Sequence, residues 1–286
     1  MNDVKVGIIG GSGVYEIDGI KDIKEVKLKT PFGKPSDSIV IGTLEGIKCA
    51  FLPRHGKGHR FLPTEVNSQA NIYALKTLGV ERIIAASACG SLKEEIKPRD
   101  FFIPDQLFDR TRLRPNTFFG NGVVGHIAFD EPYCPVLSEI VYNKAKELGI
   151  SVHRGGTYVC IEGPQFSTKV ESEVNRKLGF SIVGMTALPE VKLAREAEIC
   201  YVTIGLVTDY DVWKEGEEVT IEKVIENLIA NSNNVKRLVK AILPELKKER
   251  KCRCATAVKN AIFTQPKALN KTTLKKLKPL VGRYIK

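Results

Sequence analysis

Short apolar runs alternate along the chain with longer segments in which apolar residues recur every three to four positions. The apolar runs, which predict buried strands, are residues 4–9, 39–41, 49–52, 82–87, 101–104, 155–161, 181–184 and 199–207. The segments with helical spacing are residues 66–78, 136–148, 189–197 and 220–243. Residues 39–41 and 49–52 are expected to pair as a hairpin. This alternation predicts a single α/β domain, with a central mixed and twisted sheet flanked by helices.

The net charge of +11 is concentrated near the carboxyl end of the chain. Between Lys247 and Lys286, 13 lysines and arginines and one acid give +12, so residues 1–246 carry −1. A basic surface attracts nucleic acid, but this charge says nothing about what the main fold binds. We predict a main domain at residues 1–246, whose last helix ends at Pro244, and a basic extension at residues 247–286. The extension either packs on the body or stays mobile.

The chain shows neither a membrane anchor nor a secretion signal. No apolar run approaches the ~20 residues that a membrane span needs. The first residues enter a strand pattern directly, without the apolar segment and cleavage site of a signal peptide. We therefore expect a soluble cytoplasmic protein without a membrane partner.

The seven cysteines are at positions 49, 89, 134, 160, 200, 252 and 254. None forms a Cys-x-x-Cys pair, so we expect no structural zinc site. In a reducing compartment most of them are expected to be buried thiols. Cys252 and Cys254 are close enough in sequence to form a bridge, although two free thiols are the simpler expectation. A bridge between Cys134 and Cys200 also stays open.

Two acids, Asp209 and Asp211, follow the apolar run 199–207. Ligands of open α/β sheets bind beyond the carboxyl ends of the strands, and a period of two places both side chains on one face. Such a pair could hold a divalent metal ion, or it could exchange protons and hydrogen bonds with a polar ligand. We find no further carboxylate cluster at a strand end, which disfavours the metal.

Three other predicted strands end in groups that suit an anion. Ser12 lies in a glycine-rich turn whose backbone N–H groups could cradle a phosphate. Arg54 and His55 follow the run 49–52 and could bind phosphate oxygens, and Ser87 presents a hydroxyl among small residues. Each feature alone is equally compatible with a structural turn or a solvated loop. Together they favour a phosphate-binding floor, at which a metal is unnecessary.

Several motifs occur in an order that resembles the trimeric purine nucleoside phosphorylase family, over nearly all of residues 4–244. They include Arg54-His-Gly56, Ala88-Cys-Gly-Ser-Leu92, Ile161-Glu-Gly-Pro164, Met185-Thr186, Pro189-Glu-Val191 and Thr208-Asp-Tyr-Asp211. The resemblance implies reversible phosphorolysis of a purine nucleoside to a free purine and a ribose 1-phosphate. Inorganic phosphate is then a co-substrate, and neither a metal nor another cofactor is expected.

The resemblance also implies the roles of particular residues. Asp209 is expected to protonate purine N7, with His55 as the second catalytic residue, and Asp211 is expected to read the 6-amino group. The phosphate site is expected to comprise Ser12, Arg54, His55, Ser87, Ala88 and Thr186. The nucleoside is expected to contact Met185, Phe166, Asp209, Tyr210 and Asp211. Ser167 is expected to border the base. The pocket for the 5′ substituent is expected to be lined by Ile221, Val224 and Ile225, with His126 reaching in from a neighbouring subunit. The chain is expected to form a homotrimer or a dimer of trimers.

The resemblance is strongest to family members that cleave 5′-methylthioadenosine to adenine and 5-methylthioribose 1-phosphate. An apolar lining at Ile221, Val224 and Ile225 suits a methylthio group better than a hydroxyl. The same residues are equally typical of the core face of an amphipathic helix. Two alternatives stay open: a broad purine nucleoside phosphorylase for adenosine, inosine and guanosine, and, less favoured, a nucleic-acid-binding protein that uses its basic extension.

Overall fold

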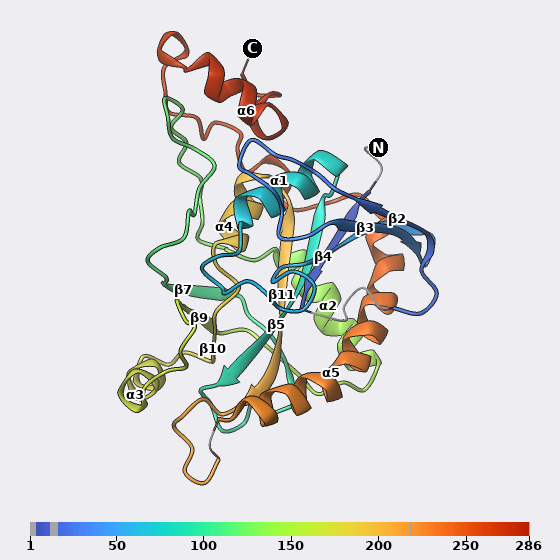
Figure 1. Cartoon of the computed structure of the whole chain (residues 1–286), viewed down its shortest axis with the longest axis vertical. Coiled ribbons are helices and arrows are strands. Elements are labelled where there is room, and N and C mark those ends of the chain that lie inside the picture. Colours follow the sequence, from blue (N-terminus) through green and yellow to red (C-terminus); the bar gives the residue numbers. More distant parts are fainter. Residues whose placement is uncertain (1–3, 12–16, 218, 286) are drawn as a thin grey trace.

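The computed structural model describes residues 4–11, 17–217 and 219–285, which form one mixed sheet with helices on both faces (Figure 1). The strands are β1 (Val6–Gly10), β2 (Lys21–Val26), β3 (Ile39–Leu44), β4 (Ile47–Pro53), β5 (Arg82–Ser91), β6 (Phe101–Ile103), β7 (Gln106–Arg110), β8 (Val152–Arg154), β9 (Thr157–Ile161), β10 (Ile182–Gly184) and β11 (Cys200–Asp209). The helices are α1 (Ser68–Leu78), α2 (Pro135–Glu147), α3 (Lys169–Lys177), α4 (Glu190–Glu196), α5 (Ile221–Ile242) and α6 (Lys271–Val281). This arrangement confirms the predicted fold class.

Parallel strands occupy the middle of the sheet, in the order β4, β1, β5 and β11. On one side, β3 and β2 continue the sheet as antiparallel strands, and β3 and β4 form the predicted hairpin. On the other side, β5 also pairs with β10, which leads to β9 and β7, while β11 pairs with β6. Because the four central strands run in the same direction, their carboxyl ends meet at one edge of the sheet.

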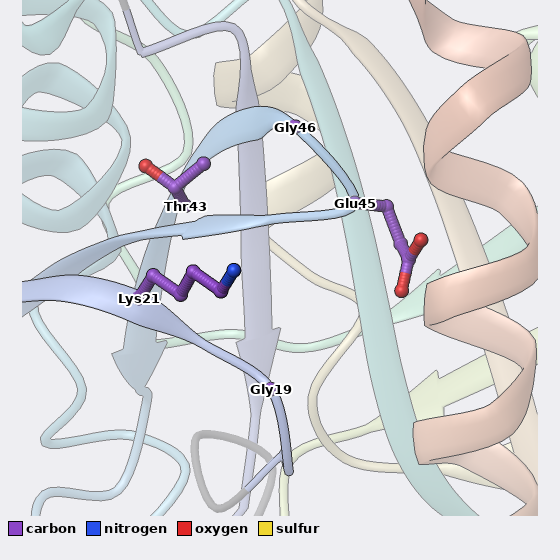
Figure 2. A pocket seen from close by; sticks show the side chains of 5 residues that line it. All are labelled: Gly19, Lys21, Thr43, Glu45 and Gly46. Carbon is purple, nitrogen blue, oxygen red and sulfur yellow. The ribbon is translucent and has the colours of Figure 1, made fainter.

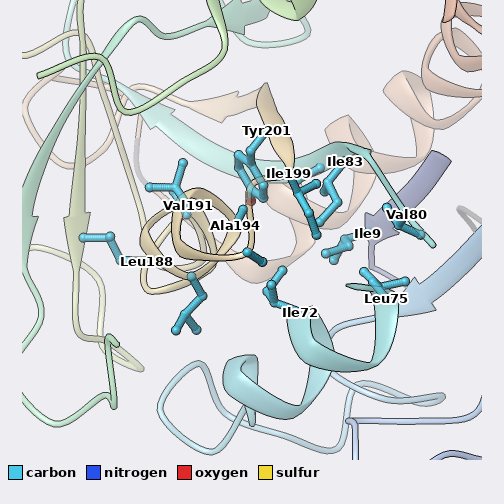
Figure 3. Packing of buried hydrophobic residues seen from close by; sticks show 14 of the residues in the cluster. Ile9, Ile72, Leu75, Val80, Ile83, Leu188, Val191, Ala194, Ile199 and Tyr201 are labelled. Atoms are coloured by element: carbon cyan, nitrogen blue, oxygen red, sulfur yellow. The ribbon is translucent and has the colours of Figure 1, made fainter. Parts of the chain in front are cut away.

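Alternate residues of the central strands fill two hydrophobic cores, one on each face of the sheet. In β5, Ile83 and Ala85 face the core beneath α1, α4 and α6, whereas Ile84 and Ala86 face the core beneath α2 and α5. Figure 3 shows the first core, in which side chains of α1 and α4 meet those of β1 and β11. The central strands are therefore covered on both faces, which explains why their sequences are continuous apolar runs.

Local capping residues set the ends of the predicted helices. Asn67 accepts a hydrogen bond from the N–H of Ala70 at the start of α1, and Gly79 ends this helix with a positive φ of 100°. Helix α5 starts after Thr220 and ends at Ile242, two residues before Pro244, as predicted. Across the described part of the chain, none of the helices combines the length and the apolar character that crossing a bilayer requires.

The apolar pattern does not predict strands β2, β7 and β8 or helix α3. Strand β2 has the sequence KDIKEV and is exposed along almost its whole length, so it lacks the apolar face of a buried strand. Helix α3 buries the polar residues Ser172 and Asn175 instead of an apolar stripe. It is marked by the reciprocal capping bonds of Thr168 and Glu171.

The basic extension packs on the body through both apolar and charged contacts. Leu280 and Val281 of α6 belong to the first hydrophobic core. Glu198, which is only 2% exposed, accepts a hydrogen bond from Tyr284 Oη at 2.7 Å and pairs with Arg283. Of the two possibilities that the sequence left open for residues 247–286, the described residues up to 285 therefore follow the packed one.

Candidate active site

A cavity of about 750 Å³ lies where β1, β4, β5 and β11 end, beside α5. This is the edge at which ligands bind in open α/β sheets. The cavity brings together most of the site residues predicted from the sequence: Arg54, His55, Ser87, Ala88, Phe166, Ser167, Met185, Thr186, Asp209, Asp211, Ile221, Val224 and Ile225.

The buried guanidinium of Arg54, directly after β4, provides positive charge in the cavity. Its Nε and Nη2 atoms donate to the Glu190 carboxylate at 2.7 and 3.1 Å, and Nη1 donates to the Ala86 carbonyl at 2.7 Å. Burial opposes the charge, but Glu190 outweighs burial and raises the pKa of Arg54. Among the described residues these bonds use three of the five guanidinium N–H donors, which leaves two for an anion.

The imidazole of His55 is held in one tautomer next to Arg54. Its Nδ1 lies 2.8 Å from the Phe61 carbonyl, which can only accept, so Nδ1 carries the proton. Burial and the positive charge of Arg54 lower the pKa of His55 to about 4. At neutral pH the ring is therefore uncharged, and Nε2 is available to accept a hydrogen bond from a ligand.

Two of the predicted phosphate ligands, Ser87 and Thr186, meet although they are far apart in sequence. Ser87 Oγ lies 2.6 Å from Thr186 Oγ1 and 3.2 Å from Tyr158 Oη. Gly184 permits this approach, because a Cβ at that position would lie 2.1 Å from Tyr158 Oη. Ser87 and Thr186 line the same cavity as Arg54.

The carboxyl of Asp209 lies opposite Gly90, three residues beyond Ser87 on β5 and therefore on the order of 10 Å from it. Thr208 Oγ1 donates to Asp209 Oδ2 at 2.7 Å, and the N–H of Asp211 donates to Oδ1 at 2.8 Å. Burial raises the pKa of Asp209, and these two hydrogen bonds oppose the rise. Glycine is required at position 90, since a Cβ there would lie 2.7 Å from Asp209 Oδ1.

Asp211 reaches the same cavity, but not through the strand alternation from which the shared face was predicted. The pairing of β11 with β5 is irregular between Val207 and Asp209, and Asp211 lies beyond the strand with a φ of 52°. Burial raises the pKa of Asp211, the hydroxyls of Ser172 and Ser167 oppose the rise, and the charge of Asp209 adds to it. The carboxyl of Asp211 is therefore near these two hydroxyls, but among the described residues its Oδ2 atom has no hydrogen bond of normal geometry.

Arg114 fixes the two loops that carry Met185 and residues 161–164. Its Nη1 donates to the carbonyls of Met185 and Leu188, both at 2.6 Å. Its Nε donates to the Glu162 carboxylate at 2.8 Å, and Nη2 donates to the Glu162 carbonyl at 2.6 Å. Sequence pattern could not indicate this role, because the partners of Arg114 are about 50 to 70 residues away along the chain.

Helix α5 contributes both to the cavity and to the hydrophobic core, and the two roles overlap in its second half. Ile221, Val224 and Ile225 line the cavity, and Ile221 and Ile225 are 64% and 51% exposed in the single chain. The buried residues of the helix begin at Asn231 and continue to Ile242. Both interpretations of this apolar face therefore hold: Ile221, Val224 and Ile225 line the cavity outside the core, whereas Val235 lines the cavity and also belongs to the core.

Two of the described residues that were predicted for the site, Tyr210 and His126, are not among those that line the cavity. A third predicted residue, Ser12, lies outside the described residues. Tyr210 is buried behind the site, with its ring 5.5 Å from that of Trp213 in an edge-on arrangement. His126 is exposed on the long connection between β7 and α2, where its N–H donates to the Ala261 carbonyl at 2.9 Å. Its expected role in a neighbouring subunit is not tested by a single chain.

Sequence reasoning missed other parts of the cavity. Glu190, which orients Arg54, lies within the quoted motif Pro189-Glu-Val191 but was given no role. Residues 59–63, which follow His55, also line the cavity, although their sequence predicts only a basic loop. The backbone N–H groups of Arg60 and Phe61 both donate to the His55 carbonyl. These two bonds fold the loop back over the site.

A second, smaller cavity of about 420 Å³ lies beside the turn between β3 and β4 (Figure 2). It is lined by Gly19, Lys21, Thr43, Glu45 and Gly46. The Glu45 side chain extends away from those of Lys21 and Thr43 (Figure 2). Its polar groups do not converge, and we place the candidate active site in the larger cavity.

Comparison with known proteins agrees with this geometry. A family model described as the phosphorylase superfamily matches residues 5–244. The chain belongs to the phosphorylase superfamily. As a member of this superfamily it is a pentosyltransferase, which acts on a nucleoside and phosphate.

Relatives within the phosphorylase superfamily match almost the whole chain. The S-methyl-5′-thioadenosine phosphorylase of Koribacter versatilis is 50% identical over 98% of this chain and 96% of that protein. The crystal structure of a methylthioadenosine phosphorylase from an antarctic soil metagenomic library is 44% identical, with a TM-score of 0.94 over 98% of this chain and 99% of that one. An adenosine/methylthioadenosine phosphorylase variant of Schistosoma mansoni, in complex with adenine, is 40% identical, with a TM-score of 0.82 over 86% and 93%.

Proposed function

We propose that the chain catalyses the reversible phosphorolysis of 5′-methylthioadenosine to adenine and 5-methylthioribose 1-phosphate. The observation that carries the proposal is the combination of three features in one cavity. These are a buried arginine with two N–H donors that the described residues do not use, a buried acid with a raised pKa at the end of the neighbouring strand, and an apolar wall from α5. The names of the relatives support the choice of substrate.

Phosphate is proposed to bind between Arg54, His55 and the hydroxyls of Ser87 and Thr186, with the backbone at Ala88 and Ser12 completing the site. The two remaining N–H donors of Arg54 suit two phosphate oxygens. Neutral His55 accepts the remaining proton of hydrogen phosphate at Nε2, which orients the anion. A phosphate oxygen held below C1′ is both the nucleophile and the counter-charge for the cationic ribose of the transition state.

The leaving purine is proposed to take a proton from Asp209. As the bond between C1′ and N9 breaks, its electron pair goes to the purine, and the carboxylic acid of Asp209 transfers its proton to N7. The raised pKa keeps this carboxyl protonated at higher pH than an exposed aspartate. Oδ2 of Asp211, which has no hydrogen bond of normal geometry among the described residues, accepts from the 6-amino group. With Arg54 at the nucleophile and Asp209 at the leaving group, the proposed reaction needs neither a metal nor another cofactor.

The remaining residues are proposed to position the sugar and the base. Met185 lies under the ribose, Phe166 and Ser167 border the purine, and Tyr210 supports them from behind. The methylthio group contacts Ile221, Val224 and Ile225, with His126 contributed by a neighbouring subunit of a homotrimer or dimer of trimers. A chain that assembles in this way covers the side chains of Ile221 and Ile225, which are exposed in the single chain.

A substrate panel tests this proposal. Release of free base from 5′-methylthioadenosine, adenosine and inosine is measured by chromatography, each with and without phosphate. We expect release of adenine that depends on phosphate, with the highest kcat/KM for 5′-methylthioadenosine. Adenosine cleaved equally well would point to the broader activity named for the Schistosoma mansoni relative. Failure to cleave any of the three would refute the proposal.

A further inference from the structure

Four of the seven cysteines, all of which lie in the described part of the chain, converge at a point away from the active site. The Sγ atoms of Cys134, Cys200, Cys252 and Cys254 all lie within 4.8 Å of one another, and those of Cys200 and Cys252 are 3.3 Å apart. All four are free thiols, and only Cys252 is not fully buried. Four sulfurs around a tetrahedral zinc ion, each about 2.3 Å from the metal, lie about 3.8 Å from one another. The observed cluster has this size.

The four thiols come from three separate segments that the fold holds in place independently. Cys134 is the N-cap of α2, and its N–H donates to the Tyr201 carbonyl of β11 at 2.9 Å. Cys200 is the first residue of β11, and its N–H donates to the Glu81 carbonyl at 2.9 Å. Cys252 and Cys254 belong to the extension, where Cys254 lies in the short 3₁₀ helix η2 (Arg253–Thr256). The cluster is therefore set by the backbone and does not depend on bonds between the sulfurs.

Two N–H groups donate to sulfur atoms of the cluster. The N–H of Leu137 donates to Cys134 Sγ at 3.5 Å, and Nη1 of the buried Arg195 donates to Cys254 Sγ at 3.3 Å. A zinc ion bound by four thiolates carries a net charge of −2, which the guanidinium of Arg195 partly neutralises.

We propose that Cys134, Cys200, Cys252 and Cys254 form a structural site for one zinc ion per chain. Soft thiolate ligands in a tetrahedral set select zinc over the hard cations that carboxylates bind. All four positions are occupied by protein, which makes the site closed and leaves no place for a substrate. Asp209 is nine positions after Cys200 along β11, which corresponds to a distance on the order of 30 Å. The ion would attach the extension to α2 and β11, and the proposal does not depend on the proposed catalytic function.

This proposal differs from the expectation drawn from the sequence, which found no structural zinc site because no Cys-x-x-Cys pair is present. Two ligands come from a Cys-x-Cys pair, and the other two lie 52 and 118 residues before Cys252. Only the folded chain brings them together. The competing state of the same four thiols is two disulfides, which would require an external oxidant and would leave no ligand for a metal.

The test uses the complete, unsubstituted chain, purified anaerobically with zinc in the growth medium and dialysed without chelator. Zinc per chain is measured by plasma mass spectrometry, and thiols are titrated in denaturant with and without a chelator. We expect one zinc per chain and seven free thiols once the chelator is present. A metal-free protein with seven thiols, or a protein with three thiols and a mass lower by four protons, would overturn the proposal.

Substitution of one ligand provides a second measurement. Cys254→Ser should weaken zinc binding at least 10-fold in a competition titration against a chromogenic chelator. Cys49→Ser, which changes a buried cysteine outside the cluster, should leave the zinc content unchanged. If Cys254→Ser does not fold, Co²⁺ is added to the metal-depleted wild-type chain. Tetrahedral thiolate absorption bands at one equivalent support the site, and their absence overturns it.

Discussion

The carboxyl of Asp209 differs from an ordinary aspartate because of what surrounds it. It is buried at the end of β11, faces the space that Gly90 leaves open, and has a raised pKa. Two hydrogen bonds, from Thr208 and from the backbone of Asp211, fix its orientation. An acid held in this way can deliver a proton to a leaving group without first reorganising.

Asp209→Asn should lower kcat for 5′-methylthioadenosine by about 10² to 10³-fold, because the amide cannot supply the N7 proton. Wild-type kcat should fall as pH rises through the raised pKa of Asp209, and the variant should lose this dependence. Steady-state kinetics between pH 5 and 9 measures both effects, and phosphate affinity should change little. Asp18→Asn, at an exposed position, is the control. Equal losses of turnover and phosphate binding would indicate a structural role for Asp209.

His55 makes a separate, pH-dependent contribution to stability. Its pKa is about 4 in the folded protein and near 6.5 in the unfolded chain. Between these values the unfolded state binds more protons, so the free energy of unfolding rises with pH across this window. On acidification from pH 6.5 to 4, wild type should lose on the order of 2 kcal/mol more than His55→Gln. Urea denaturation at several pH values measures this difference, and parallel profiles would contradict it.

Residues that line the cavity could be found from sequence more readily than residues that hold them in place. Arg54, Ser87 and Asp209 follow apolar runs, so their place at the sheet edge could be predicted. Glu190 and Arg114 act through partners distant in the chain, and neither periodicity nor spacing carries that information. Strand alternation predicted that the Asp211 side chain faces the site. The side chain does reach the site, but it does so because the end of β11 is irregular.

Helix α5 shows that one amphipathic pattern can serve two purposes along its length. The apolar stripe continues through the helix: its first residues line only the cavity, its buried residues begin at Asn231, and Val235 belongs to both cavity and core. Periodicity alone could not separate these roles, because the difference depends on where the sheet ends. The same limit applies to β2, an exposed edge strand, and to α3, which buries polar residues.

Ile225→Ser should raise KM for 5′-methylthioadenosine about 10-fold. It should also lower the ratio of kcat/KM for 5′-methylthioadenosine to kcat/KM for adenosine. The substitution removes apolar contact with the methylthio group and supplies a hydroxyl that can pair with the 5′-hydroxyl of adenosine. Ile229→Ser is the matched control, since Ile229 is on the same helix, is 67% exposed, and does not line the cavity. Competition between the two nucleosides measures the preference. An equal effect of both variants would show that the helix, and not the contact, determines the result.

At the scale of the whole molecule, the extension is an integral part of the fold. Arg250 pairs with Glu81, and Arg283 pairs with Glu198, so part of the basic charge is used within the chain. The net charge of this segment therefore gave no indication that the segment packs on the body. The match with relatives over 98% of the chain also includes most of the extension.

Glu198→Gln should lower the free energy of unfolding by about 2 kcal/mol, because a buried carboxylate that accepts from three groups is lost. Glu249→Gln, at an exposed position of the extension, should change it by less than about 0.5 kcal/mol. Urea denaturation followed by circular dichroism measures both variants. No difference between them would mean that the extension contributes little to stability.

The shared core of Val4 and Val281 has a consequence for biosynthesis. A ribosome makes the chain from its amino end, and residues 4 to 83 already supply β1, α1 and the start of β5. Their apolar side chains stay only partly covered until α6, nearly 200 residues later, has left the exit tunnel. The nascent chain therefore exposes an unfinished core through most of its synthesis, which makes it a candidate client for chaperones that hold partly folded chains.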